Sequence, residues 1–214
     1  MMERECKVLL EEKGFQVLRT LGKGAFGIVF QVKKEEYGTI AAKVMNEDEF
    51  DANEWRTGFR LSHQNHCPFI LNYISTTMYG LKTIILMEYA NLKNLDTLIE
   101  TKKEIPIPII RAIMKQLLEG LRTMHDSGII HRDIKGQNIL LNNLPGSRCV
   151  QIKIADLGLA KIQRNVLQSM TMTVVGTFPY MPPELTMDNA KDVKADAKVD
   201  VWAAGIIFHQ LVTH

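Results

Sequence analysis

Short runs rich in apolar and β-branched residues follow one another through the first half of the chain, and turn residues bound each run. The runs cover residues 15–21, 28–34, 38–45, 69–76 and 82–90. Runs of this length and composition are typical of β-strands. The polar segment at residues 46–61 has helical character. We therefore predict an antiparallel sheet of sequential strands that carries one inserted helix.

The second half of the chain changes to a helical period. Apolar residues recur at helical spacing at Ile113, Leu117, Leu121 and Met124. The pattern predicts a helix from Ile109 to about Gly128. Because Met114 and Leu118 widen its apolar stripe, we expect this helix to be central to a core. A last apolar helix begins near Asp200, so the chain reads as a β-rich smaller lobe followed by a helical larger lobe.

Composition narrows the classes of protein to consider. At 214 residues the chain can form one domain with two lobes. The 26 basic and 24 acidic side chains nearly balance, so we expect no nucleic-acid partner. Three cysteines lie far apart without CxxC spacing, which is typical of free thiols in a reducing compartment.

Two segments were candidates for export or membrane insertion, and neither has the required pattern. Residues 1–14 are charged at positions 3 to 5 and lack a long apolar core, so they do not predict a signal peptide. Residues 201–212 are apolar, but the run is too short to span a membrane and contains His209 and Gln210. We expect no membrane partner and a cytoplasmic or nuclear location.

Residues 21–29, LGKGAFGIV, contain a GxGxxG pattern that supports several readings. A dinucleotide-binding fold needs the glycines to open a helix, but a strand-like run follows here. A Walker-type loop needs Lys-Ser/Thr after the last glycine, where this chain has Ile28 and Val29. A glycine loop between two strands remains. Such a loop either presses backbone amides onto phosphates or is a plain hairpin with a glycine bulge.

The stretch HRDIKGQNIL, residues 131–140, places Asp133, Lys135 and Asn138 on a short loop ahead of an apolar run. Singly, such residues are common in surface loops, where they serve turn chemistry and solvation. Together they can hold a proton, a positive charge and a metal ligand at one point. The loop is therefore a candidate catalytic site.

Six motifs occur in one order along the chain: GKGAFGIV, AAK, HRDIKGQN, DLG, PPE and DVWAAG. In this order and spacing they resemble the serine/threonine branch of the eukaryotic protein kinase family, from about Phe15 onward. The resemblance implies an α+β, two-lobed fold, with a small antiparallel β lobe carrying one helix and a mainly α-helical large lobe. It implies an N-terminal extension at 1–14 and a kinase domain at 15–214, divided into lobes at about 15–87 and 95–214 by a hinge at about 88–94.

The same resemblance implies an ATP site built on the glycine loop. Lys43 would grip the α- and β-phosphates and be held by a glutamate of the inserted helix. Glu54 is the best candidate for that glutamate, with Glu47 and Glu49 as rivals. An apolar slot and the hinge backbone would hold the base. The implied ATP-binding residues are Leu21, Gly22, Lys23, Gly24, Ala25, Phe26, Gly27, Ile28, Val29, Ala41, Lys43, Glu54, Met87, Glu88, Ala90 and Leu140.

Phosphoryl transfer requires charge neutralisation and alignment more than covalent help. The resemblance makes Asp133 the acceptor of the substrate hydroxyl proton and gives Lys135 the role of stabilising the transferring group. Asn138 and Asp156 would ligate Mg²⁺, with Mn²⁺ as the other candidate. Lys135 and Thr177 favour serine and threonine hydroxyls over tyrosine. The expected activity is ATP-dependent phosphorylation of protein substrates.

Two features bear on regulation. Arg132 precedes the catalytic aspartate and could pair with a phosphate on the activation segment. The candidate phosphosites are Ser169, Thr171 and Thr173. Leu157 stands where the family commonly has phenylalanine in DFG, which leaves the aspartate ligand in place but changes how the segment packs.

The larger lobe reads as incomplete, because the chain stops at His214, near the end of the helix that begins at Asp200. In the family, later helices cover this helix and supply an arginine partner for Glu184. The residues expected to be partly uncovered are Val201, Trp202, Ile206, Ile207 and Leu211. We therefore expect a partner or self-association through this helix. The alternative function is a truncated fragment or pseudokinase that binds nucleotide or protein without catalysis.

Overall fold

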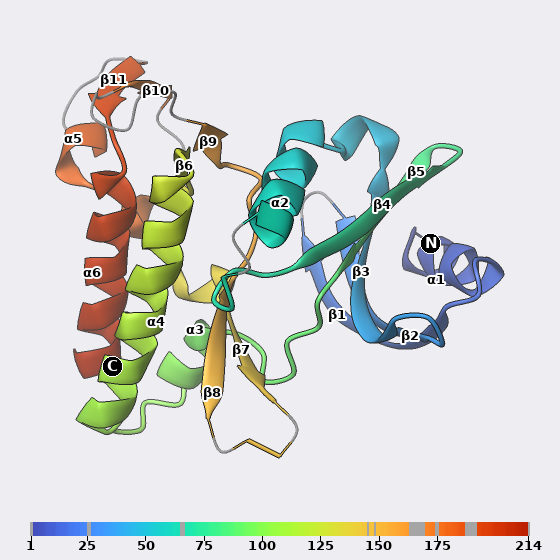
Figure 1. Cartoon of the computed structure of the whole chain (residues 1–214), viewed down its shortest axis with the longest axis horizontal. Helices are drawn as coiled ribbons and strands as arrows, with labels where there is room; N and C mark the ends of the chain where they lie inside the picture. The colour runs from blue at the N-terminus through green and yellow to red at the C-terminus, as the bar shows by residue number, and fades with distance from the viewer. Residues whose placement is uncertain are drawn as a thin grey trace. The chain divides into compact units, whose positions relative to one another are not determined.

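The computed structural model describes residues 2–24, 27–64, 67–144, 146–147, 149–162, 170–173, 176–186 and 192–213 (Figure 1). Its helices are α1 (Met2–Glu12), η1 (Glu47–Glu49), α2 (Ala52–Gln64), α3 (Leu95–Ile99), α4 (Ile107–Asp126), η2 (Gly136–Asn138), η3 (Phe178–Tyr180), α5 (Pro183–Thr186) and α6 (Lys198–Thr213). Its strands are β1 (Gln16–Gly24), β2 (Gly27–Lys34), β3 (Gly38–Asn46), β4 (Tyr73–Tyr79), β5 (Lys82–Met87), β6 (Ile129–Ile130), β7 (Ile139–Asn143), β8 (Val150–Ile154), β9 (Lys161–Ile162), β10 (Met170–Thr173) and β11 (Asp192–Ala195). The predicted α+β class is confirmed.

The chain divides into two compact units. The first comprises Met1–Phe59 and Asn72–Tyr89, and the second comprises Arg60–Leu71 and Ala90–His214. The first unit holds the sheet, and the second holds α4, α6 and the short β-ribbons. The lobe and hinge limits derived from the sequence stay predictions.

The predicted sheet is present in the first unit as five antiparallel strands in the order β1-β2-β3-β5-β4. Side chains alternate between its two faces. One face buries Phe30, Ala42 and Leu86 in a core that also contains Cys6 and Leu10 of α1. The sequence analysis treated residues 1–14 only as an extension, whereas residues 2–12 form a helix that completes this core.

The fourth strand begins later than predicted. The apolar run at 69–76 predicted a strand from its first residue, but β4 covers Tyr73–Tyr79. The reason is that Ile70 forms a parallel bridge with Ile154 of the second unit, to which Leu71 also belongs. The amide of Leu71 donates to the carbonyl of Ile154 at 2.9 Å. The start of the apolar run therefore pairs with β8, and its later residues form β4.

The inserted helix is shorter than the polar segment that predicted it. Residues 46–61 begin with the single turn η1, and α2 starts at Ala52 after a break. The carboxylate of Asp51 accepts from the amide of Asn53 at 2.7 Å, which satisfies a donor at the start of α2. Gly58 lets α2 approach β4, because a Cβ there would lie 2.6 Å from the ring of Tyr73.

Helix α4 is the core helix of the second unit, as its apolar period predicts. Its buried face consists of Ile110, Ile113, Leu117, Gly120, Leu121 and Met124. Gly120 permits a close approach to β8, since a Cβ there would lie 2.7 Å from Cδ1 of Ile154. The inclusion of Leu118 in the apolar stripe was wrong. Its side chain is 47% exposed, because it lies beside the buried face.

Helix α6 packs beside α4 (Figure 1), and this contact decides which of its apolar residues are covered. Ile207 and Leu211 are fully buried, so the expectation that they would be partly uncovered was wrong. Val201 and Trp202 are about half exposed, as expected, and Ile206 is partly exposed. Among the described residues no helix has both the length and the apolar character needed to cross a membrane.

The neighbours Leu117 and Leu118 allow a matched test of core packing. Leu117→Ala is expected to lower the free energy of unfolding by about 2–5 kcal/mol, because a fully buried side chain leaves a cavity. Leu118→Ala should lower it by about 1 kcal/mol or less, because that side chain is half exposed. Denaturant unfolding followed by circular dichroism measures both. Equal losses would contradict the packing described for α4.

Candidate active site

The catalytic loop predicted at residues 131–140 follows strand β6 and is fixed by one buried carboxylate. Asp200 of α6 is 1% exposed, and its two oxygens accept from the amides of His131 at 2.9 Å and Arg132 at 2.8 Å. His125 Nε2 of α4 lies 2.8 Å from the same carboxylate. These bonds hold Arg132 in the left-handed region, with φ of 68°. Asp200 was expected at the start of the last helix, whereas His125 was not singled out from the sequence.

His131 is fully buried and joins the loop to the strand that leads to Asp156. Its Nδ1 accepts from the amide of Asp133 at 3.3 Å. A neutral ring that accepts at Nδ1 carries its hydrogen on Nε2, which lies 3.0 Å from the carbonyl oxygen of Ala155 and therefore donates to it. The amide of Ala155 in turn donates to the carbonyl of Asn138 at 2.9 Å. The ends of the loop are thus tied to the residue before Asp156.

The carboxylate of Asp133 is the centre of the site and is surrounded by donors. Thr177 Oγ1 donates to Oδ1 at 2.7 Å, and Lys135 Nζ lies 2.7 Å from Oδ2. Lys135 also donates to Thr177 Oγ1 at 2.9 Å, so the three side chains form a closed triangle. Asn138 Nδ2 donates to Oδ2 of Asp133 at 3.0 Å and to its carbonyl at 2.8 Å. The structure therefore brings all four predicted residues together.

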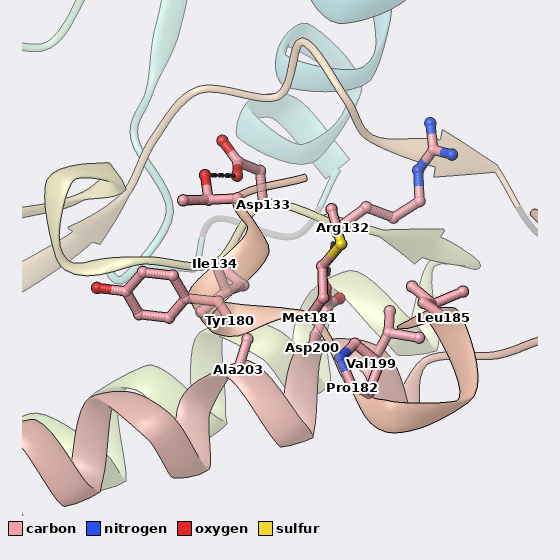
Figure 2. A pocket seen from close by; sticks show the side chains of 11 residues that line it. Arg132, Asp133, Ile134, Tyr180, Met181, Pro182, Leu185, Val199, Asp200 and Ala203 are labelled. Carbon is pink, nitrogen blue, oxygen red and sulfur yellow. Dashed lines mark hydrogen bonds between the residues drawn. The ribbon is translucent and has the colours of Figure 1, made fainter. Parts of the chain in front are cut away.

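Figure 2 shows the surroundings of Asp133, with its bond to Thr177 dashed. A pocket beside it is lined by Tyr180, Met181 and Pro182 of the segment that follows Thr177, and by Asp200 and Ala203 of α6, among others. The pocket lies next to the carboxylate that would receive a proton.

Asp133 is held in its ionised form. Burial alone would raise the pKa of its carboxyl, but the hydrogen bonds from Lys135, Thr177 and Asn138 and the charge of Lys135 outweigh burial. The net effect is a pKa below the usual value for aspartate. The group therefore contributes to stability above its unfolded-state pKa, and this contribution is lost as the pH falls through the lower folded-state pKa. At neutral pH it is a carboxylate that can accept a proton.

Asn138 and Asp156 present oxygen atoms suited to a hard divalent cation. Both hydrogen bonds of Asn138 described above use its amide nitrogen, so the amide oxygen is the atom that can ligate. Asp156 is exposed and has φ of 64°, between buried Ala155 and buried Leu157. An amide oxygen and a carboxylate fit the ligand preference of Mg²⁺, which binds few protein oxygens and retains waters and phosphates. Leu157 is 1% exposed, so it fills its site despite being smaller than phenylalanine.

The first unit contains a largely buried ion pair. Lys43 Nζ of β3 lies 3.2 Å from Oε1 of Glu54 on α2, and Glu54 is 7% exposed. Tyr73, which the sequence analysis did not single out, donates to the same oxygen at 3.4 Å. The rival Glu47 is exposed, and Glu49 instead accepts from the amide of Asn46 at 3.2 Å. Of the three candidates, Glu54 is the one that contacts Lys43 in the described residues.

The glycine-rich turn joins β1 to β2. Gly27 has φ of 143°, and a Cβ there would lie 2.5 Å from the carbonyl oxygen of Val44, so glycine is required at this position. The other predicted ATP-binding residues of the first unit lie in its strands. Strand β1 contains Leu21, Gly22, Lys23 and Gly24, and strand β2 contains Ile28 and Val29. Ala41 lies in β3, and Met87 ends β5. Glu88 follows β5 in the first unit, while Ala90 and Leu140 belong to the second.

Three predicted residues lie outside the described residues: Ala25, Phe26 and Ser169. Thr171 and Thr173 lie in β10, where they pair with Lys194 and Asp192 of β11.

Sequence reasoning missed a contact that supports the catalytic loop from α3. Gly136 is buried, and a Cβ there would overlap Oδ1 of Asp96 and lie 2.8 Å from its Cγ. Burial raises the pKa of Asp96, helped by Glu100, although a hydrogen bond from Gln137 and the charge of Lys135 act against this. The glycine in HRDIKGQN was the only local signal, and it does not reveal its partner.

Substitutions at Gly136 and Asp96 are therefore expected to be coupled. Gly136→Ala should lower the free energy of unfolding by about 1–3 kcal/mol, because Asp96 must move. Adding Asp96→Ala should restore part of the loss, since it removes the two side-chain atoms that a new Cβ meets and leaves only the backbone nitrogen of residue 96 close by. Gly205→Ala is the control, because a Cβ at this position of α6 meets nothing within 4 Å. Thermal melting measures the stability of all four variants, including the double variant. The coupling would be disproved if the loss in the double variant equalled the sum of the losses in Gly136→Ala and Asp96→Ala.

The comparisons with known proteins agree with this geometry. A family model described as "Protein kinase domain" matches residues 15–214. Serine/threonine-protein kinase 10 of Danio rerio is 31% identical over 201 residues, which are 92% of this chain and 20% of that protein. Serine/threonine-protein kinase ULK1 of Homo sapiens is 32% identical over 203 residues, 90% of this chain and 19% of that protein.

A third relative, serine/threonine-protein kinase chk-1 of Caenorhabditis briggsae, is 32% identical over 207 residues, 93% of this chain and 40% of that protein. The chain thus spans between 19% and 40% of the length of these curated relatives. Because the family match covers most of its length, the chain belongs to the protein kinase domain family.

Proposed function

We propose that this chain transfers the γ-phosphoryl group of ATP to serine and threonine hydroxyls of protein substrates. The observation that carries the proposal is the closed triangle of Asp133, Lys135 and Thr177, with Asn138 bonded to the same carboxylate. A carboxylate that stays ionised at neutral pH, beside a fixed cation, can receive a hydroxyl proton while charge develops nearby. The names of the related serine/threonine kinases support the same reaction.

The residues of this chain would divide the work. Asp133 orients the substrate hydroxyl and takes its proton, and Lys135 lies where it can stabilise negative charge on the transferring group. Lys43, held by Glu54, binds phosphate oxygens, and the backbone amides of the glycine-rich turn do the same. Asn138 and Asp156 would hold Mg²⁺, or Mn²⁺ as the other candidate. The bound metal and ATP would supply charge neutralisation and the group to be transferred.

The contact between Lys135 and Thr177 supports preference for serine and threonine. Thr177 bonds both Lys135 and Asp133, so the segment that follows it is fixed close to the proton acceptor. A short aliphatic hydroxyl needs its chain to approach the carboxylate closely, whereas a tyrosine would hold its main chain further away. Peptides that differ only in serine, threonine or tyrosine at one position would test this preference directly.

Regulation by phosphorylation of the activation segment is a further part of the proposal. Arg132 is partly buried, and its Nε donates to the carbonyl of Leu159 at 2.6 Å, so the guanidinium already contacts that segment. A phosphate on Thr171 or Thr173 would offer it a stronger acceptor. Loss of turnover on replacing both threonines by alanine supports this, and unchanged turnover contradicts it.

Asp133→Asn is expected to lower the phosphotransfer rate about 10²-fold or more, because an amide cannot accept the proton. Nucleotide binding should persist, and a ligand at 100 times its dissociation constant stabilises the folded chain by about 2.7 kcal/mol. The measurements are transfer of labelled phosphate to a protein substrate and melting with and without magnesium-ATP. Asp126→Asn is the control, since this exposed aspartate at the end of α4 removes the same charge elsewhere.

The two readouts separate the alternatives. A rate that survives Asp133→Asn would rule out the assigned role of Asp133. Nucleotide-dependent stabilisation without any transfer in the unsubstituted chain would favour a binding module or pseudokinase over an enzyme.

A further inference from the structure

Helix α1 lies before the first residue that the family model matches, yet it is part of the core of the first unit. Cys6 is 2% exposed and Leu10 is fully buried, and both pack in the same cluster as Phe30 and Val32 of β2. Figure 1 shows α1 beside the sheet of this unit. The kinase domain of this chain therefore carries an additional helix that packs against the strands joined by the glycine-rich turn, β1 and β2.

One side chain of α1 reaches the glycine-rich segment. Glu3 accepts from Thr20 Oγ1 at 2.6 Å through Oε1, and its Oε2 lies 2.8 Å from Lys23 Nζ. Lys7, one turn further along α1, lies 2.9 Å from Oε1. The hydrogen bonds from Lys23, Thr20 and Lys7 lower the pKa of Glu3 to about 2, so the group is charged at all ordinary pH values. Its two main partners flank Gly22.

The segment that Glu3 contacts pairs with β2, and Arg19 within it donates to Gln31 at 2.7 Å and to Tyr89 at 2.8 Å. Strand β1 is at the edge of the sheet, and apart from Val17 and Thr20 its residues are exposed. Its register with β2 shifts between Val17 and Arg19 and again between Thr20 and Gly22. Each shift interrupts the regular ladder of backbone bonds. The second shift lies between the residues that Glu3 holds.

We propose that Glu3 is a positioning residue for the glycine-rich turn, acting through Thr20 and Lys23 from a helix anchored by Cys6 and Leu10. The inference rests on the proposed function, in which this turn binds the phosphates of ATP. Glu3 touches no reacting group. It limits the conformations of β1 at the irregularity, so less order has to be gained when nucleotide binds.

The matched variants are Glu3→Gln and Glu5→Gln. Both residues lie in the first turn of α1, so each substitution removes one negative charge from the same end of the helix dipole. Glu5 is exposed and lacks contacts to β1 among the bonds of the described residues. Any effect of charge alone on α1 should therefore appear in both variants, whereas loss of the tether should appear only in Glu3→Gln.

The first readout is hydrogen–deuterium exchange of the amides of residues 19–24 without nucleotide. Glu3→Gln should exchange faster by about two- to fivefold, the range that one partly exposed ion pair supports, and Glu5→Gln should match the unsubstituted chain. The difference should shrink at about 1 M salt, because the Lys23 pair is exposed and screened. Equal exchange in both variants would overturn the inference, whatever the activity of the chain.

The second readout is steady-state kinetics with a protein substrate. Glu3→Gln should raise KM for ATP about two- to fivefold and leave kcat within about twofold, with an unchanged melting temperature. In a Lys23→Gln background the same substitution should have a smaller effect, since its partner is gone. A fall in kcat and melting temperature together would show a merely structural helix and overturn the positioning role. If Glu3→Gln exchanges faster but the chain binds no nucleotide, the contact of Glu3 with β1 would be supported and the proposed function would be contradicted.

Discussion

The buried carboxylate of Asp200 is the constraint on which the catalytic loop depends. A charge with 1% of its surface exposed is costly unless donors surround it, and here two main-chain amides and His125 do so. The amides belong to His131 and Arg132, so the hydrogen bonds that the carboxylate needs also fix the backbone at these two residues. Arg132 adopts a left-handed φ that costs an ordinary residue about 1–3 kcal/mol, and the buried bonds offset that cost. The direction of the next residue, Asp133, follows from this turn.

Asp156, the aspartate proposed to bind metal, is positioned in a similar way, through its neighbours instead of its own hydrogen bonds. Asp156 also has a left-handed φ, and its carboxylate is exposed. The residue before it, Ala155, forms hydrogen bonds through its amide to Asn138 and through its carbonyl to His131. The residue after it, Leu157, is buried. A left-handed residue between two fixed neighbours has little choice of direction. Asp133 and Asp156, the proposed proton acceptor and metal ligand, are thus linked through His131, which would take no direct part in the reaction.

Much of this arrangement could be predicted from sequence, because its residues are encoded by local spacing. The six motifs predicted the catalytic loop and the ion-pair candidates, and periodicity predicted α4 and the five-stranded sheet. What escaped depends on contacts between distant segments. Gly136 has a meaning only beside Asp96, and Leu118 fits an apolar stripe by spacing but lies outside the face that α4 buries. The start of β4 shifted because Ile70 pairs with Ile154, which periodicity within one run cannot reveal.

The restraints on the two elements proposed to handle phosphate differ in kind. The catalytic loop is held by buried bonds in which main-chain groups take part, and each bond lost there would leave a polar group unsatisfied. The glycine-rich turn follows β1, an exposed edge strand with two register shifts against β2. On its other side, Gly27 of β2 approaches Val44 closely. A proton acceptor must keep one direction through each turnover, whereas a turn that covers phosphates must admit and release a ligand. Buried bonds suit the first task. For the second, a partly exposed ionic tether such as the one proposed for Glu3 limits disorder and, because water screens it, is weak enough to break when a ligand enters or leaves.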